Sequence, residues 1–244
     1  MVKMKDYLTA ALALALLVTA PLAAQDDGTR YMQEAGGAAL LYRGHKAYSY
    51  PMAYNGTYFW DGPSFTEGTV LYNGITYAGL PLNVDASRQD LLVKTPAGGA
   101  EKVLASEYVK EFTLGSRRFL NLQSCYGDTA PKGYWELIYD GKAKVVKQVV
   151  RTLKQDLDGT LRSQMGYDDA TYRSEVHSIF TYQARYCYIS ASGQIEPIRR
   201  RSQLLKFYKE RKREINRRIS ALESRGAVDF DRFCREAMIL AEAR

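Results

Sequence analysis

The stretch from Gly68 to Thr95, GTVLYNGITYAGLPLNVDASRQDLLVKT, constrains the fold more than any other part of the chain. Short β-prone runs alternate there with turn formers, and Asn73-Gly74 stands between two of those runs. Asn-Gly tolerates positive φ at both central positions of a type I′ turn, so it predicts a two-residue hairpin. The segments expected as strands are 70–72, 75–77, 80–84 and 91–94. This part of the chain therefore predicts an antiparallel meander.

The β pattern continues well beyond this stretch. Gly115-Ser116 and Asp140-Gly141 each separate two alternating segments and predict further hairpins. The other expected strands are 40–50 (two strands and a turn), 102–104, 108–114, 117–122, 134–139, 143–153, 177–189 and 194–198. Residues 156–169 are polar and contain two glycines, so a loop is expected there.

The hydrophobic period changes from two to about 3.6 after residue 201. Apolar residues at helical spacing predict helices with a break near Tyr208, an end near Gly226, and a final helix capped by Asp229 or Asp231. Strands first and helices last predict an α+β fold. We expect an antiparallel β-meander, with a curled half-barrel as one form of it, followed by two or three C-terminal helices.

The N-terminus has the pattern of a secretory signal peptide. Two lysines precede an apolar run from Leu8 to Ala20, Pro21 ends the run, and small residues lead to Ala24, after which we expect cleavage. A retained anchor is the alternative, although the run is short for a bilayer. The expected domains are 1–24 as signal peptide, 25–198 as a β-rich domain and 199–244 as a basic helical segment packed on it. The expected location is the periplasm, the cell envelope or the exterior, without a membrane span after cleavage.

The basic charge of the chain is concentrated in one segment. The formal net charge is +7, but residues 198–218 hold ten Lys or Arg against two Glu. Three interpretations are open: a solvated helix face, a surface that binds an anionic envelope component or an acidic protein, and a nucleic-acid site, which does not suit an exported protein. The candidate anion-binding residues are Arg199, Arg200, Arg201, Arg211, Lys212, Arg213, Arg217 and Arg218.

Cysteines and one threonine are candidates for covalent modification. An exported protein can form disulfides, and Cys125 with Cys187 is the expected pair because both lie in the β-rich part. Cys234 falls within a helical pattern and is expected to be a buried thiol. Thr129 stands in an Asp-Thr-Ala triplet, which resembles the acceptor of a bacterial O-glycosylation system.

Aromatic residues are dense between Tyr54 and Phe65, in the run YNGTYFWDGPSF. Rings mixed with Gly, Asn and Asp can line a site for a sugar or a peptide. They can equally close one end of a small barrel. A cavity beside these rings would favour the first interpretation, and dense packing would favour the second.

Recognisable reaction centres are missing from the sequence. It lacks a Gly-x-Ser-x-Gly elbow, a His-Glu-x-x-His helix and a phosphate-binding glycine loop, and its two histidines are far apart. Asp168 and Asp169 with Glu175 form a polar acidic group that is typical of a solvated loop. We assign no catalytic residue, no cofactor and no metal ligand.

The order of several motifs resembles a group of uncharacterised exported proteins of Gram-negative bacteria with an N-terminal β-meander and a basic C-terminal helical segment. The motifs are LLYRGHKAY, GTVLYNGITYAGLPLNVDASRQDLLVK, YVKEFTL, GSRRFLNL, GYWELIYDGKAKVVK and SQLLKFYKERKREINRRI. The resemblance implies export and a shared architecture, and it carries no catalytic residue across. The sequence leaves two functions open: a non-catalytic envelope protein that binds or scaffolds, and a secreted glycoside-type hydrolase with a carboxylate pair that its spacing does not reveal.

Overall fold

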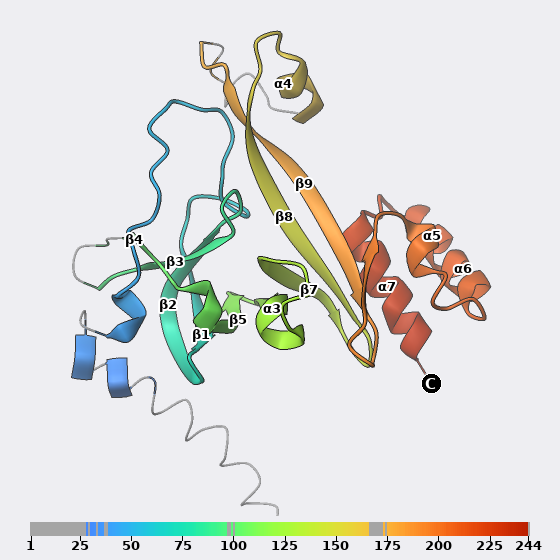
Figure 1. The fold of residues 1–244 in the computed structure, drawn as a ribbon. Coiled ribbons are helices and arrows are strands. Elements are labelled where there is room, and N and C mark those ends of the chain that lie inside the picture. The colour runs from blue at the N-terminus through green and yellow to red at the C-terminus, as the bar shows by residue number, and fades with distance from the viewer. Residues whose placement is uncertain are drawn as a thin grey trace, which may run out of the picture.

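The structure is a computed structural model that describes residues 28–243, apart from 29, 33, 37, 38, 97, 98, 100, 166–172 and 174. The expected signal peptide and the Asp168-Asp169 pair lie outside the described residues. Figure 1 shows the described chain from the N-terminal turns, in blue, to the C-terminal helices, in red.

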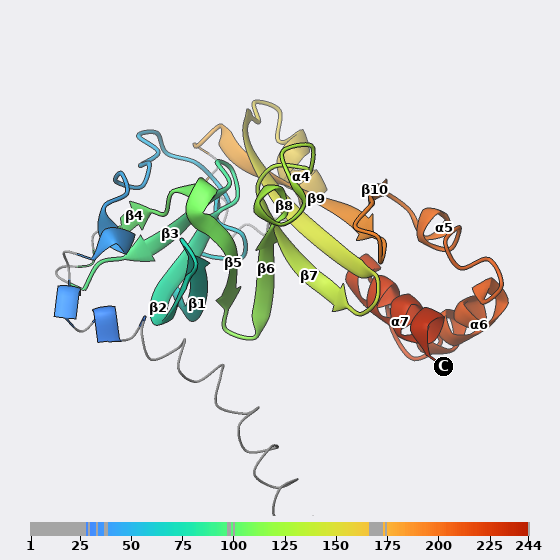
Figure 2. The same ribbon diagram turned by 60° about the horizontal axis from the view of Figure 1, so that its bottom comes forward.

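Ten strands within the described residues form one sheet in which all neighbours are antiparallel. They are β1 (Thr66–Tyr72), β2 (Ile75–Asp85), β3 (Asp90–Lys94), β4 (Glu101–Val103), β5 (Val109–Leu114), β6 (Arg117–Asn121), β7 (Tyr134–Asp140), β8 (Lys144–Gln155), β9 (Ser178–Ile189) and β10 (Ile195–Ile198). Figure 2 shows the sheet as an arch with β4 and β10 at its two ends. The expected α+β class with an antiparallel meander is confirmed.

The strand order, β10-β9-β8-β7-β6-β5-β1-β2-β3-β4, consists of two meanders joined at β1. Strands β1 to β4 are added in one direction. The chain then returns through the short 3-10 helix η3 (Ser106–Tyr108), and β5 pairs with the other side of β1. Strands β5 to β10 are added in the opposite direction. The end strands β4 and β10 do not pair with each other, so the sheet is open and is not a closed barrel.

Curvature of the sheet brings the β2–β3 turn onto β8. The backbone N–H of Arg151 donates to the carbonyl of Ala86 at 3.1 Å, and Gln89 Nε2 donates to the carbonyl of Val149 at 2.9 Å. These contacts join strands that are far apart in the sheet order. They give the curled half-barrel form that was one of the expected outcomes.

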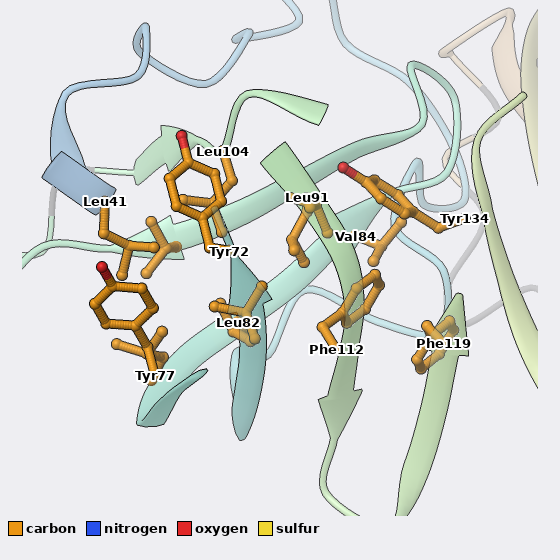
Figure 3. Packing of buried hydrophobic residues seen from close by; sticks show 14 of the residues in the cluster. Leu41, Tyr72, Tyr77, Leu82, Val84, Leu91, Leu104, Phe112, Phe119 and Tyr134 are labelled. Carbon is orange, nitrogen blue, oxygen red and sulfur yellow. The ribbon is translucent and has the colours of Figure 1, made fainter. Parts of the chain in front are cut away.

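The inner face of the curl carries the main hydrophobic core. Figure 3 shows Leu82 and Leu91 packed with Phe112 and Phe119, and Tyr134 lies at one side of this group. The rings of Phe112 and Phe119 are stacked with their centroids 4.8 Å apart. Burial of such side chains is the main favourable term for a sheet of this kind, at roughly 25 cal/mol per Å² of apolar surface.

The Asn73-Gly74 hairpin between β1 and β2 has the expected geometry. Asn73 has φ 49° and Gly74 has φ 78°, and the flanking residues Tyr72 and Ile75 are paired. Positive φ at both positions is the mark of a type I′ turn. The prediction that this dipeptide closes a two-residue hairpin is therefore confirmed.

Replacing Gly74 by Val is expected to lower the free energy of unfolding by about 1–3 kcal/mol, because a β-branched residue is strained at positive φ. A Cβ at Gly74 would meet nothing within 4 Å, so crowding does not contribute. Denaturant titration measures the change. Gly74→Asn is the control, and it should cost less because Asn tolerates this conformation. Equal stability of Gly74→Val and the unmodified protein would contradict the assignment.

Three helices follow β10: α5 (Arg201–Leu204), α6 (Lys212–Glu223) and α7 (Phe230–Glu242). Tyr208 lies in the turns between α5 and α6, so the expected break is confirmed. Asp229 caps α7, because its Oδ1 accepts from the N–H of Arg232 at 2.7 Å. The expectation of a capped final helix is also confirmed.

The helices pack on the inner face of the sheet, beside the half-barrel (Figure 1). Ile215 of α6 and Phe233 of α7 belong to one buried cluster with Ile138 of β7 and Val145 of β8. Val149, four residues after Val145 on β8, belongs to the core of the half-barrel. Side chains four apart on a strand share a face, so both clusters cover the inner face.

Two local expectations are wrong. Residues 40–50 do not form a strand pair: they contain the short 3-10 helix η2 (Leu40–Tyr42) and a single bridge from Lys46 to Lys102 of β4. Leu41 is fully buried in the core, and β4 has only three residues to pair with, so a longer strand has no partner. The expected loop at 156–169 includes a helix, α4 (Thr160–Met165).

Candidate functional site

A row of four side chains crosses the outer face of the sheet, opposite the helices. The register pairs Glu136 with Lys147, which brings Trp135 of β7 opposite Gln148 of β8 one step further along. Gln148 is paired with Arg185 of β9. Ile198, the last residue of β10, is paired with Tyr186, which follows Arg185 on β9, and Arg199 comes directly after Ile198. The row is Trp135, Gln148, Arg185 and Arg199.

These four residues line one groove of about 1030 Å³. Lys132, in the chain before β7, forms part of its wall, and Phe230 at the start of α7 lies at another side. The lining includes three basic residues, Lys132, Arg185 and Arg199, and no Asp or Glu. A cavity of this size with a few convergent polar groups is the usual form of a ligand site.

Hydrogen bonds hold the first half of the row in place. The carbonyl oxygen of Lys132 accepts from Trp135 Nε1 at 3.3 Å and from Gln148 Nε2 at 2.8 Å. Gln148 Nε2 also donates to Gln89 Oε1 at 3.0 Å, in the β2–β3 turn. Both Trp135 and Gln148 are buried, at 3% exposure each. The side chains of Trp135 and Gln148 are therefore held in place by the protein itself.

The second half of the row is exposed and positively charged. Arg185 and Arg199 are exposed, and within the described residues neither has an ion-pair partner. Arg185 Nη2 donates only weakly, to Gln183 Oε1 at 3.4 Å. Both cations therefore line the groove and are open to solvent.

A second cavity of about 380 Å³ shares Pro131, Cys187 and Pro197 with the groove. Thr129 and Tyr126 line this second cavity. The candidate O-glycosylation residue Thr129 thus lies beside the groove. The modification itself stays a prediction.

The three cysteines are free thiols in the structure. Cys125 and Cys187 pack in one apolar cluster on the outer face, so the disulfide expected between them stays a prediction. Burial raises the pKa of Cys187 to about 11 and raises the pKa of Cys125 as well. A thiol with a raised pKa is protonated at neutral pH and is a poor nucleophile. Cys234 is fully buried in the helix cluster.

Three of the eight candidate residues in the basic segment hold the helices together. Arg201 pairs with Glu223 at 2.5 Å and its Nη2 donates to the carbonyl of Val228 at 2.8 Å. Arg211 pairs with Glu214 of the same helix at 3.2 Å, and its Nη1 donates to the carbonyl of Ala243 after α7. Arg218 of α6 pairs with Glu236 of α7 at 3.6 Å. The positive charges of these three side chains are therefore paired with carboxylates of the protein itself.

The other five candidates are Arg199, Arg200, Lys212, Arg213 and Arg217, and all five are exposed. Across the described part of the chain, none of the five is in an ion pair. Arg213 and Arg217 are four residues apart on α6, on the side away from the buried Ile215 and Ile219. Four of the five are therefore solvent-facing cations of the helical segment, three of them on α6, and Arg199 belongs to the groove.

The aromatic stretch from Tyr54 to Phe65 packs against the sheet. Phe59 and Trp60 are buried, and the ring of Trp60 meets the ring of Phe119 edge-on at 5.0 Å. Tyr58 lies 4.2 Å from Phe59, centroid to centroid. A cavity of about 420 Å³ borders this stretch at Trp60, Asp61, Gly62 and Ser64, and Tyr54, Tyr58 and Phe59 are not in its lining. Dense ring-to-ring contact favours the interpretation of this stretch as a cover.

Carboxylates near this cover are held by ion pairs or by hydrogen bonds. Arg117 binds Glu136 with two bonds, of 2.8 and 3.2 Å, and binds Asp61 at 3.2 Å. Asp85 is buried, and its Oδ1 accepts from the N–H groups of Ser87 and Arg88, so it shapes the β2–β3 turn. Burial raises the pKa of Asp85. The contacts of Asp61, Asp85 and Glu136 thus stabilise the fold.

Comparisons with known proteins identify no relative of this chain, so its function is argued from the structure. No family model, no curated protein and no solved structure matches the chain. Every helix in the described part of the chain is too short or too polar to cross a bilayer.

Sequence reasoning found Arg199 as part of the basic segment and did not single out Trp135, Gln148 or Arg185. These residues come from separate hairpins, and no motif joins them. The alternation along each strand assigns a side chain to a face. Only the strand register decides which side chains come opposite one another, so the row could not be found from the sequence.

Proposed function

We propose that the protein is an exported, non-catalytic protein of the cell envelope that binds an anionic surface through its helical segment. One observation carries the proposal: Arg200, Lys212, Arg213 and Arg217 are exposed, and within the described residues they are in no ion pair. A cation without an internal partner remains available to an external anion.

The expected interaction is weak and reversible. A basic side chain close to an anionic membrane contributes about 1 kcal/mol. Four such side chains are enough for measurable binding at low ionic strength. Because exposed charges are screened over about 8 Å at physiological salt, binding should fade as salt rises.

Replacing Lys212, Arg213 and Arg217 together by Gln is expected to lower the partition onto anionic vesicles at least about tenfold at low salt. Gln is close to Lys and Arg in helix propensity, so α6 should stay folded. The three residues exclude Arg211, which donates to the carbonyl of Ala243 after α7, and Arg218, which pairs with Glu236 of α7. Co-sedimentation with vesicles of phosphatidylglycerol and phosphatidylcholine, against phosphatidylcholine alone, measures the effect.

The matched control replaces Arg43, Lys110 and Lys154 by Gln, because these residues are also exposed but lie outside the helical segment. It removes the same charge from the whole protein and should bind vesicles nearly as the unmodified protein does. Equal loss in both triple variants would mean that only net charge matters. Equal binding to charged and neutral vesicles would leave the segment as a solvated face.

A further inference from the structure

We propose that an acidic peptide in extended conformation adds as a strand to β9, in the slot between Asn55 and the end of β10. The slot is the part of the β9 edge from Thr181 to Arg185. This binding goes beyond the attachment to anionic surfaces above, because it concerns a different ligand and different residues. It rests on unpaired backbone groups of β9 and on the charge beside them.

The slot is a gap in the cover of one strand edge. On one side, β9 pairs with β8 along its whole length, from Ser178 to Ile189. On the other side, β10 pairs only with Tyr186 to Ile189. At the opposite end of the same edge, Asn55 donates to the carbonyl of Ser178 at 2.7 Å and accepts from the N–H of Phe180 at 2.9 Å. Within the described residues, no strand covers the slot between these two partners.

The direction of the backbone groups in the slot follows from the bonds to Asn55. Successive residues of a strand direct their N–H and C=O groups to opposite edges. Ser178 and Phe180 bond to Asn55, so the even-numbered residues of β9 face away from β8. The pairing of β8 with β9 has no register shift, so the alternation continues through the slot. The N–H and C=O groups of Tyr182 and Ala184 therefore point to the open edge.

The β10 end gives the same alternation. Pro197 has no N–H, so it cannot belong to a pair that exchanges two hydrogen bonds. Its partner on β9 lies between Tyr186 and Tyr188, so these two even-numbered residues make the exchanging pairs with β10. In the part of the chain that the structure describes, the backbone groups of Tyr182 and Ala184 have no hydrogen-bond partner at this edge.

Unpaired backbone groups on a strand edge select an extended polypeptide, which offers C=O and N–H groups in the same alternation. A second copy of this chain does not fit through its own β9. That strand has 12 residues and would bring its own β10 and Asn55 against the closed ends of the slot. A short extended segment from a loop or a tail of another protein fits between the two ends.

Charge beside the slot selects an acidic segment. Arg185 and Arg199 are exposed, and within the described residues neither is in an ion pair. The groove borders the slot at Gln183, Ala184 and Arg185, and its lining contains no Asp or Glu. Opposite charges on neighbouring strands attract each other. An added strand with acidic side chains on the outer face would therefore place them beside Arg185 and Arg199.

Titration of the unmodified protein with the fluorescein-labelled peptide Glu-Val-Glu-Val-Glu, followed by anisotropy, tests this binding. The two Val residues would come opposite Ala184 and Tyr182, and their N–H groups would donate to β9. N-methylation of both Val residues removes these donors and should weaken binding at least about tenfold. N-methylation of the central Glu is the matched control, because its N–H points away from β9. That control should change the affinity less than about threefold.

Two variants place the binding in the slot. Ala184→Pro removes an N–H that faces the slot and is not part of the β8 ladder, so the strand should tolerate it and peptide binding should be lost. Arg185→Glu should weaken the acidic peptide about fivefold and strengthen binding of Lys-Val-Lys-Val-Lys. Arg225→Glu is the matched control, since Arg225 is exposed and lies outside the groove lining. Arg185→Glu decides the question if Ala184→Pro lowers the melting temperature.

No binding of Glu-Val-Glu-Val-Glu up to about 1 mM would overturn the proposal. Equal binding of the peptide N-methylated at both Val residues would also overturn it, because charge alone would then hold any polyanion, an acidic polysaccharide included. Equal affinity for the acidic and the basic peptide would contradict the selection by Arg185. A dimer of the unmodified protein that Ala184→Pro converts to a monomer would show that the slot takes a second copy instead.

Discussion

Replacing Asp231 by Ala is expected to lower the free energy of unfolding by about 3 kcal/mol, because it removes one partner of a largely buried ion pair. The Asp231 carboxylate accepts from Lys147 Nζ at 2.5 Å and from the Tyr186 hydroxyl at 2.6 Å. Lys147 lies on β8 and Tyr186 on β9, while Asp231 is in the first turn of α7. Only 12% of the Lys147 side chain is exposed, so the ammonium would lose its counter-charge in a dry site.

Thermal unfolding should show a fall in melting temperature of roughly 6–12 °C for Asp231→Ala. Glu236→Ala is the matched control on the same helix. Its partner Arg218 is 52% exposed at 3.6 Å, and such pairs contribute about 1 kcal/mol or less. A similar small loss in both variants would mean that the Asp231 contacts do not anchor α7.

The pH dependence of this effect has a defined sign. Burial alone would lower the pKa of Lys147, but the hydrogen bond and the charge of Asp231 raise it above its ordinary value. A raised pKa in the folded state means that the contribution is fully present below the unfolded pKa of about 10.4. It is lost as pH rises through the folded pKa. The stability difference between Lys147→Gln and the unmodified protein should therefore shrink above about pH 10.5.

Replacing Gly68 by Ala is expected to cost about 3 kcal/mol, through a clash between two strands. A Cβ at Gly68 of β1 would lie 1.9 Å from the carbonyl oxygen of Thr113 on β5. The register of β1 shifts between Gly68 and Val70, and Thr69 is held by Thr113 Oγ1 at 2.9 Å. Because backbone atoms meet there, the strain cannot be relieved by turning a side chain. The β1–β5 pair joins the two meanders, so the whole sheet should be affected.

Denaturant titration of Gly68→Ala against Gly62→Ala isolates this effect. A Cβ at Gly62 would meet nothing within 4 Å, so this control should change stability by less than about 1 kcal/mol. Equal stability of the two variants would show that β5 can move away from β1 at little cost.

Local chemistry decided most of the secondary structure. Asn73-Gly74 predicted its hairpin because few other dipeptides tolerate positive φ twice. Asp229 predicted the start of α7 because its side chain accepts from a first-turn N–H. The strand pair predicted for residues 40–50 is wrong, because Leu41 and Tyr42 are β-prone in sequence but are buried in the core within a 3-10 helix. Whether such residues find a partner strand depends on β4, which local sequence does not specify.

The basic residues of the candidate site were also predicted only in part from the sequence. The sequence located the basic segment, since a charge count needs no structure. It did not distinguish Arg201, Arg211 and Arg218, which pair with acids, from the cations that are in no ion pair within the described residues. The pairs of Arg201 with Glu223 and of Arg218 with Glu236 depend on how the helices pack on one another, whereas Arg211 and Glu214 are only three residues apart.

The sequence by itself determined the antiparallel hairpins, the helical C-terminal segment and the place where positive charge gathers. Each of these follows from interactions between residues close in the chain: turn dihedral angles, apolar periodicity and net charge. Only the tertiary structure decided the two-way strand order, the docking of α7 through Asp231, and the row formed by Trp135, Gln148, Arg185 and Arg199. These features depend on pairing between distant segments, where register, curvature and burial set which groups meet.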